Sequence, residues 1–126
     1  MEKYKILRLG IIEESLENKD ILEILKSYFI SQYIENVSED ECPIWHTNEY
    51  HVDEDKTCEL LDMLKDVLKP TWYIHAFNEE KLYVVLSGNW FEISLHKDES
   101  WSEMIEYGVN CANVERRFLE LIPLHI

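Results

Sequence analysis

The sequence predicts an α+β domain, with helices packed on one face of a mostly antiparallel sheet. Two observations carry this prediction. Three strand-like segments joined by short polar turns form a meander over about residues 71–96, and segments with helical periodicity lie on either side of it. At 126 residues, of which 46 % are hydrophobic, the chain has the size and composition of one folded domain spanning residues 1–126.

The chain before the meander begins with an expected strand and an expected helix. Residues 4–12 are mostly apolar and predict an N-terminal strand. A helix is expected from Asp20 to about Glu35, with apolar residues at helical spacing. Its start is indicated by Asp20 and Glu23, because this capping-box pattern satisfies two backbone donors that the first helical turn leaves unpaired.

A second strand and a second helix follow, and a third helix comes after the meander. Residues 44–52 predict a strand, and Asp53 begins a helix that ends before Pro70, since proline disfavours helical backbone in the residue before it. If strand 44–52 joins the sheet of the meander, it can run parallel to the first meander strand across a right-handed crossover. Ser100 begins the third helix and Gly108 ends it.

The lengths of the two turns set the register of the meander. Gly88-Asn89 has the composition of a two-residue hairpin turn, which places Leu86 opposite Phe91. A four-residue loop at 78–81 sets the pairing of the first two strands. One face of the meander is then a core face that helices must cover. It carries Tyr73, His75, Phe77, Leu82, Val84, Leu86, Phe91, Ile93 and Leu95.

The opposite face of the meander, called the aromatic face below, is half apolar and also needs a cover, because large open apolar patches are uncommon on monomers. The chain's own elements are the favoured cover, and a homodimer through this face or a bound ligand are the alternatives. Its candidate binding residues are Trp72, Tyr83, Trp90 and the carboxylate Glu92. The whole face carries Trp72, Ile74, Ala76, Tyr83, Val85, Ser87, Trp90, Glu92, Ser94 and His96.

The negative charge is concentrated in one part of the chain. The net charge is −14, and between residues 35 and 66 eleven acidic residues stand against two lysines. Such a surface repels a phosphate backbone, so no nucleic-acid partner is expected, whereas a basic protein would be attracted. Asp53 and Asp55 are candidate contacts for a basic partner. Both also lie where a helix begins, and stabilisation of the helix dipole explains them equally well.

A metal site or another cofactor is not expected. Cys42, His46, His51 and Cys58 fall within seventeen residues, which invites a zinc interpretation. The pattern lacks a Cys-x-x-Cys pair, however, and the odd separation of the two histidines places them on opposite faces of a strand. The zinc interpretation is therefore the weaker one.

No catalytic residue can be assigned from motifs. The sequence has no P-loop, dinucleotide fingerprint or Ser-His-Asp spacing, and three glycines are too few for a phosphate cradle. His75 lies among apolar neighbours, where burial favours its neutral form and a hydrogen-bond partner is needed. An alternative function is a small-molecule-binding or hydrolytic pocket between helix and sheet, using His75 with Tyr73, or Glu92 on the other face.

The sequence indicates a cytoplasmic protein. Three cysteines argue against a disulfide framework and for a reducing compartment. The apolar start of the chain is too short and too interrupted by charges for a signal peptide or a membrane span, so no membrane partner is expected.

About a third of the chain, from Lys69 to Gly108, resembles a set of small uncharacterised bacterial proteins. The resemblance implies a compact bacterial cytosolic domain and supplies no activity. The acidic, aromatic-bearing composition is also similar to that of immunity proteins that neutralise basic toxins. We therefore expect a non-enzymatic protein-interaction module, an immunity-like binder of a basic partner. The residues of the resemblance are Lys69-Pro70-Thr71-Trp72-Tyr73, His75, Phe77, Leu82-Tyr83-Val84-Val85, Phe91-Glu92-Ile93-Ser94 and the segment from Trp101 to Gly108.

Overall fold

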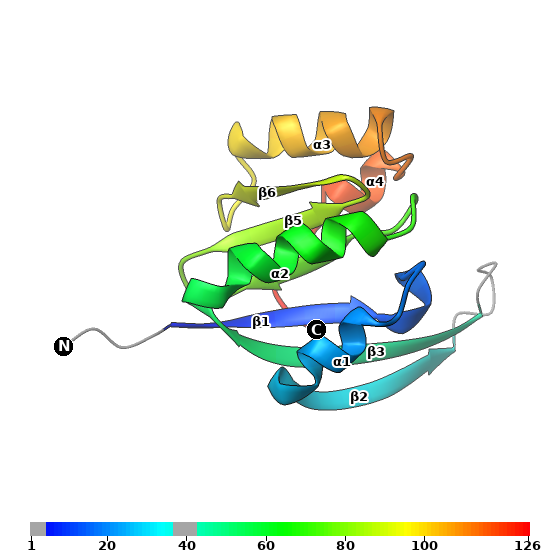
Figure 1. The fold of residues 1–126 in the computed structure, drawn as a ribbon. Coiled ribbons are helices and arrows are strands. Elements are labelled where there is room, and N and C mark those ends of the chain that lie inside the picture. Colours follow the sequence, from blue (N-terminus) through cyan, green and yellow to red (C-terminus); the bar gives the residue numbers. More distant parts are fainter. Residues whose placement is uncertain (1–4, 37–42) are drawn as a thin grey trace.

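A computed structural model describes residues 5–36 and 43–126 and contains one six-stranded sheet in the order β2-β3-β1-β4-β5-β6 (Figure 1). Every neighbouring pair is antiparallel, so the predicted α+β class is confirmed. The strands are β1 (Ile6–Ile12), β2 (Phe29–Asn36), β3 (Ile44–Asp53), β4 (Ile74–Phe77), β5 (Leu82–Leu86) and β6 (Asn89–Ile93). The helices are α1 (Ile21–Leu25), α2 (Glu54–Val67), α3 (Ser100–Asn110) and α4 (Arg116–Leu119).

The N-terminal strand β1 lies at the centre of the sheet. It pairs with β3 on one side and with β4 on the other, antiparallel to both. The strands β3 and β4 therefore run parallel to each other, as the sequence indicates, but β1 is inserted between them. The helix α2 makes the connection from β3 to β4 over one face of the sheet (Figure 1).

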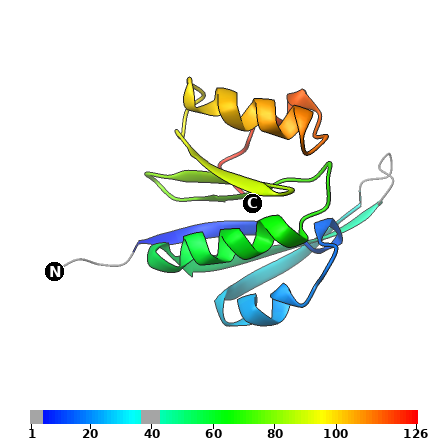
Figure 2. The ribbon, with the colours of Figure 1, turned by 45° about the horizontal axis from the view of Figure 1, so that its top comes forward.

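Helices cover both faces of the sheet, which corrects the expectation that they pack on one. The helices α1 and α2 lie on one face and α3 lies on the other (Figure 2). The physical reason is visible in β5, whose five residues Leu82–Leu86 are all buried. Because successive side chains of a strand point to opposite faces, a strand that is apolar at every position must be covered on both.

The helix α2 covers the aromatic face of the meander. Its Leu60, Leu61 and Leu64 belong to the same buried cluster as Tyr83 and Val85. The favoured expectation, a cover from the chain's own elements, is confirmed. A homodimer through this face would have to displace α2.

The other face of the meander is the predicted core face. Its buried residues pack with α3, α4 and the segment that follows. Phe77 pairs with Leu82 as the loop length predicts. The last two strands differ from the prediction, because Leu86 pairs with Asn89 and the two-residue turn is Ser87-Gly88. A shift of two residues keeps every side chain on its predicted face.

Gly88 is the second residue of the observed turn. Its φ is +92°, a conformation that glycine adopts without the strain of a side chain. Its N–H donates to the carbonyl of Lys65 at the end of α2, at 2.9 Å. A contact with α2, which the local sequence does not reveal, therefore accompanies the observed position of the turn.

The helix expected from Asp20 to about Glu35 is wrong over most of its length. α1 has only five residues and a 3-10 turn, Lys26–Tyr28, follows it. The chain then forms β2, which pairs with β3. The residues of β2 include aromatic and β-branched side chains, which fit a pleated strand as well as they fit one face of a helix. Pairing with β3 decides between the two.

Candidate functional site

A pocket of about 1040 Å³ lies beside the half of the sheet that α3 and α4 leave open. These two helices pack over β4, β5 and β6 and leave the same face of β1, β2 and β3 uncovered. Residues of β1, β2 and β3 form one wall of the cavity, which is called the sheet pocket below. Its opposite wall comes from the segment after α3, including Val114, Phe118 and Pro123.

Aromatic side chains form much of the sheet pocket. Tyr33 comes from β2, Trp45 from β3, and Trp72 and Tyr73 from the segment that leads into β4. The rings of Trp45 and Trp72 meet edge to face, with centroids 5.2 Å apart. This arrangement is favourable because the positive edge of one ring contacts the negative face of the other.

The indole of Trp45 also carries an unusual polar atom. Its Nε1–H is buried and has no hydrogen-bond partner among the residues that the structure describes. An unpaired buried donor of this kind costs about 1–3 kcal/mol.

His75 lies at the floor of the pocket, beside Gly10 of β1. Its side chain stacks on Phe77 with centroids 5.3 Å apart. Nε2 lies 3.1 Å from the carbonyl oxygen of His125, and since a carbonyl only accepts, Nε2 carries the proton and donates it. Burial lowers the pKa of His75 to about 4, so the ring is neutral near pH 7.

The two tyrosines of the pocket keep their protons as well. Burial raises the pKa of the Tyr73 phenol. Burial also raises the pKa of Tyr33, and the nearby Glu35 carboxylate adds to this effect. The pocket thus presents neutral phenols and a neutral imidazole at pH 7.

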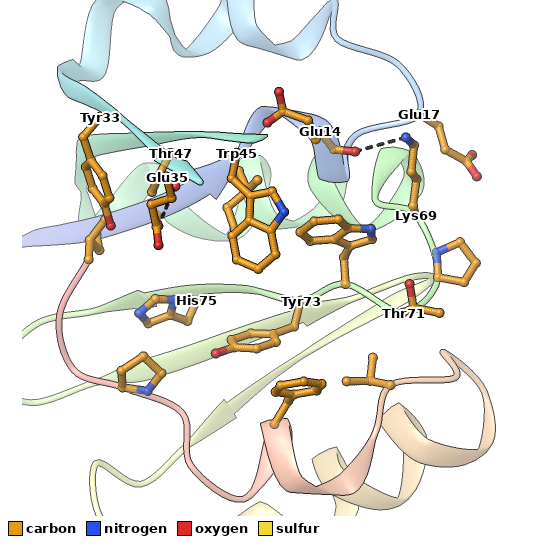
Figure 3. Close-up of a pocket in the computed structure, with 18 of the residues that line it drawn as sticks. Glu14, Glu17, Tyr33, Glu35, Trp45, Thr47, Lys69, Thr71, Tyr73 and His75 are labelled. Carbon is orange, nitrogen blue, oxygen red and sulfur yellow. Dashed lines mark hydrogen bonds between the residues drawn. The ribbon is translucent and has the colours of Figure 1, made fainter. Parts of the chain in front are cut away.

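Charged groups occupy the two ends of the sheet pocket (Figure 3). At one end lie Tyr33, Glu35 and Thr47, and the Thr47 hydroxyl donates to Glu35 at 3.2 Å. At the other end lie Glu17 and Lys69.

Lys69 and Glu14 are held by contacts within the chain. The ammonium of Lys69 donates to the backbone carbonyl of Glu14 at 3.0 Å. The Glu14 carboxylate accepts the backbone N–H of His46 at 2.7 Å and binds its ring Nδ1 at 2.5 Å. Partial burial opposes ionisation of Glu14, but the hydrogen bonds from His46 outweigh it and lower the pKa of this carboxyl.

No protein-family model, curated protein or solved structure matches the chain. The resemblance to small bacterial proteins stays a prediction. Within the described ranges, no helix is both long and apolar enough to cross a membrane.

The structure brings some of the predicted site residues together and separates the others. Trp72 and His75 line the sheet pocket, with Tyr73 between them in sequence. Tyr83 is buried in the cluster that α2 covers, and the half-buried Trp90 donates its indole N–H to Asp62 of α2 at 2.7 Å. Glu92, Asp53 and Asp55 are exposed and do not line the sheet pocket.

Sequence reasoning missed the contribution of β2 and β3 to the pocket. The sequence predicts a helix for Tyr33 and Glu35, and it predicts a strand for Trp45 without indicating which strands lie beside it. In the sheet Tyr33 pairs with Thr47, and Glu35 pairs with Trp45. The alternation of these residues with Gln32 and Ile34 was the only signal, and a strand interpretation of the segment would have used it.

The residues of the disfavoured zinc interpretation do not converge in the part of the chain that the structure describes. His46 binds Glu14, and Nε2 of His51 lies 2.8 Å from Glu49. Cys42 lies outside the described residues. Over residues 5–36 and 43–126, no group of three or more His, Cys, Asp or Glu side chains could hold a metal ion.

Proposed function

We propose that the protein is a non-enzymatic binding domain that holds a small organic cation with an apolar body in the sheet pocket. The observation that carries the proposal is a cavity of about 1040 Å³ that combines aromatic rings with the Glu35 carboxylate. Small-molecule sites are typically concave, about 300–1,000 Å³ in volume, and mostly apolar with a few polar groups. The sheet pocket is of this kind.

The chemistry of the walls favours a positively charged ligand. The faces of Trp and Tyr rings attract cations, and Tyr33 and Trp45 flank Glu35. Glu35 accepts a hydrogen bond from Thr47, and a carboxylate has room for a further donor from a ligand. The net charge of −14 also raises the local concentration of cations. Lys69 lies at the other end of the pocket, so the cationic group belongs at the Glu35 end.

A hydrolytic function has less support. A general base works best when its pKa is close to the working pH, and burial lowers the pKa of His75 to about 4. The Nε2 proton of His75 is already donated to the His125 carbonyl. The Tyr73 phenol is protonated at neutral pH, because burial raises its pKa. These groups suit hydrogen bonding to a ligand better than proton transfer.

A titration with three benzene derivatives tests the proposal. Benzylammonium, benzyl alcohol and benzoate share a ring and differ in charge, and the indole N–H signals of Trp45 and Trp72 report binding in NMR spectra. We expect benzylammonium to bind most tightly and to shift both signals. Glu35→Gln should weaken this binding about tenfold, the loss of about 1.4 kcal/mol. The exposed Glu92→Gln is the matched control, and equal binding of all three compounds would refute the proposal.

A second candidate function is the binding of a basic protein, for which α2 supplies a specific observation. Asp55, Glu59, Asp62 and Asp66 are exposed and follow one another at helical spacing, so they form an acidic ridge on the outer side of α2. Asp53 precedes this ridge. The ridge fits the immunity-like binder expected from the composition.

Basic proteins retained by the wild-type chain and by an Asp55→Asn/Glu59→Gln variant should be compared at low and moderate salt. We expect the double variant to lose the partner, and salt to weaken the wild-type complex. A partner that the wild type and the double variant bind equally at both salt concentrations would contradict this second function.

A further inference from the structure

The outer edge of the sheet at β2 is long and apolar. β2 is the terminal strand of the sheet, and seven of its eight residues are exposed. Four large apolar side chains, Phe29, Ile30, Tyr33 and Ile34, are between 43 and 64 % exposed. The backbone N–H and C=O groups along such an edge form a template on which another strand can pair.

The features that usually protect a sheet edge are scarce along β2. Its sequence contains no lysine and no proline. One register shift lies between Phe29 and Ser31, and from Ser31 to Asn36 the pairing with β3 is regular. A stretch of six residues is about the usual length of a strand in a globular protein.

The opposite edge of the sheet differs. β6 has five residues, and the chain's own side chains bind the backbone directly after it. The N–H of Ser94 donates to the Ser100 hydroxyl at 2.9 Å, and Trp101 donates its indole N–H to the Ser94 carbonyl at 2.8 Å. The contrast singles out β2 as the edge that is suited to pairing.

We propose that β2, from Ser31 to Asn36, is a strand-addition site for an extended segment of a basic partner protein. Added strands gain affinity from backbone hydrogen bonds and specificity from alternate side chains. Ile34 and Tyr33 point to opposite faces of the sheet and offer apolar contacts on both.

Charge decides between a basic partner and a second copy of this chain. Glu35 lies within the edge strand, and Gln32 donates to the carboxylate of Glu13 at 3.0 Å. The same Glu13 oxygen accepts from Asn48 of β3 at 2.9 Å and so lies between β2 and β3. Glu35 is therefore the carboxylate of the edge strand that lysine or arginine on an added strand would meet. A second copy would bring another chain with a net charge of −14. Cross-strand pairs of opposite charge are stabilising and pairs of like charge are not.

Synthetic peptides test this inference without changing the protein. The probe is a short peptide of alternating valine and lysine. One control carries N-methyl groups on alternate residues, which keeps the charge but removes backbone donors, and another has glutamate in place of lysine. We expect only the first peptide to slow hydrogen exchange of the amides from Ser31 to Asn36.

A pair of protein variants then locates the contact. Ile34→Lys and Leu121→Lys make the same change at exposed apolar residues, and Leu121, which is 79 % exposed, lies outside the sheet. We expect Ile34→Lys to weaken peptide binding at least tenfold and Leu121→Lys to change it less than about twofold, equivalent to about 1.4 and 0.4 kcal/mol. Circular dichroism checks that both variants are folded.

Three outcomes would overturn the inference. The N-methylated peptide could bind as tightly as the parent peptide, which would reduce the contact to charge attraction. Both variants could lose affinity equally, which would place the contact elsewhere. Sedimentation could reveal a dimer whose protected amides are those of β2, which would assign the edge to a second copy. Tyr33 and Glu35 also line the sheet pocket, so benzylammonium binding is measured separately, from the indole signals in the absence of peptide.

Discussion

Replacing His75 by glutamine should make the free energy of unfolding less sensitive to acid. His75 is 9 % exposed, and burial lowers its pKa from the ordinary value of 6.5 to about 4. Below pH 6.5 the unfolded chain binds a proton on this imidazole, and the folded chain does not bind it until about pH 4. The folded state therefore loses stability as the pH falls through this window.

The size of this loss follows from the change in pKa. One pKa unit corresponds to about 1.36 kcal/mol, so the fall from 6.5 to about 4 amounts to about 3 kcal/mol between pH 7 and pH 4. Other ionisable groups also affect the acid sensitivity of the free energy of unfolding, but they are present in both proteins. The difference between wild type and His75→Gln isolates the imidazole.

Urea unfolding followed by circular dichroism, at pH values from about 4.5 to about 7.5, measures this difference. Glutamine has an amide N–H that can still donate to the His125 carbonyl, so the hydrogen bond need not be lost. The wild type should lose more stability than His75→Gln as the pH falls, whereas the exposed His96→Gln should behave like the wild type. Parallel curves for wild type and His75→Gln would show that His75 titrates as a solvated group, and would refute the burial argument.

Three further substitutions test the packing of two helices and one ion pair. Leu61→Ala removes a fully buried side chain of α2 and should cost about 2–5 kcal/mol in urea unfolding. Gly108→Ala should destabilise by about 1–2 kcal/mol, because the new methyl would collide with the buried Leu119 and this cost exceeds the gain of about 1 kcal/mol in helix propensity. Glu49→Gln should cost about 1 kcal/mol, and less in high salt, because the amide keeps only one of the two oxygens that accept from Arg8, at 2.9 and 3.1 Å, and carries no charge.

Each of these three substitutions has a control variant or a result that would contradict the prediction. Ile24→Ala, at an exposed apolar residue, is the control and should change the free energy of unfolding little. If Leu61→Ala cost no more than Ile24→Ala, α2 would not be packed on the sheet. A more stable Gly108→Ala would contradict the close packing of α3 and α4. The hydrogen bonds from Arg8 lower the pKa of Glu49. Their contribution to the free energy of unfolding should therefore be present above the ordinary carboxylate pKa and be lost as the pH falls through the lowered pKa.

The candidate site could be predicted only in part from the sequence. Alternation within the meander places His75 and Tyr73 on one face, and both line the sheet pocket. Their partners across the pocket, Tyr33 and Trp45, are 28 or more residues away in the chain. Only the pairing of β1 with β3 and β4 brings the two groups to one face of one sheet.

The sequence by itself determined the features that depend on near neighbours along the chain. These are the meander, the face to which the side chains of β4, β5 and β6 point, and the positions of α2 and α3. Alternation, helical periodicity and proline or glycine at the ends act over a few residues, so they can be recognised locally.

The tertiary structure decided the features that depend on distant partners. The segment from Phe29 to Asn36 suits either a helix or a strand, and its hydrogen bonds with β3 make it a strand. β1 occupies the centre of the sheet because its apolar side chains Leu7, Leu9 and Ile11 join the largest buried cluster. Side chains from separate strands form the pocket, because burial and backbone pairing are satisfied by the whole sheet and not by any one segment.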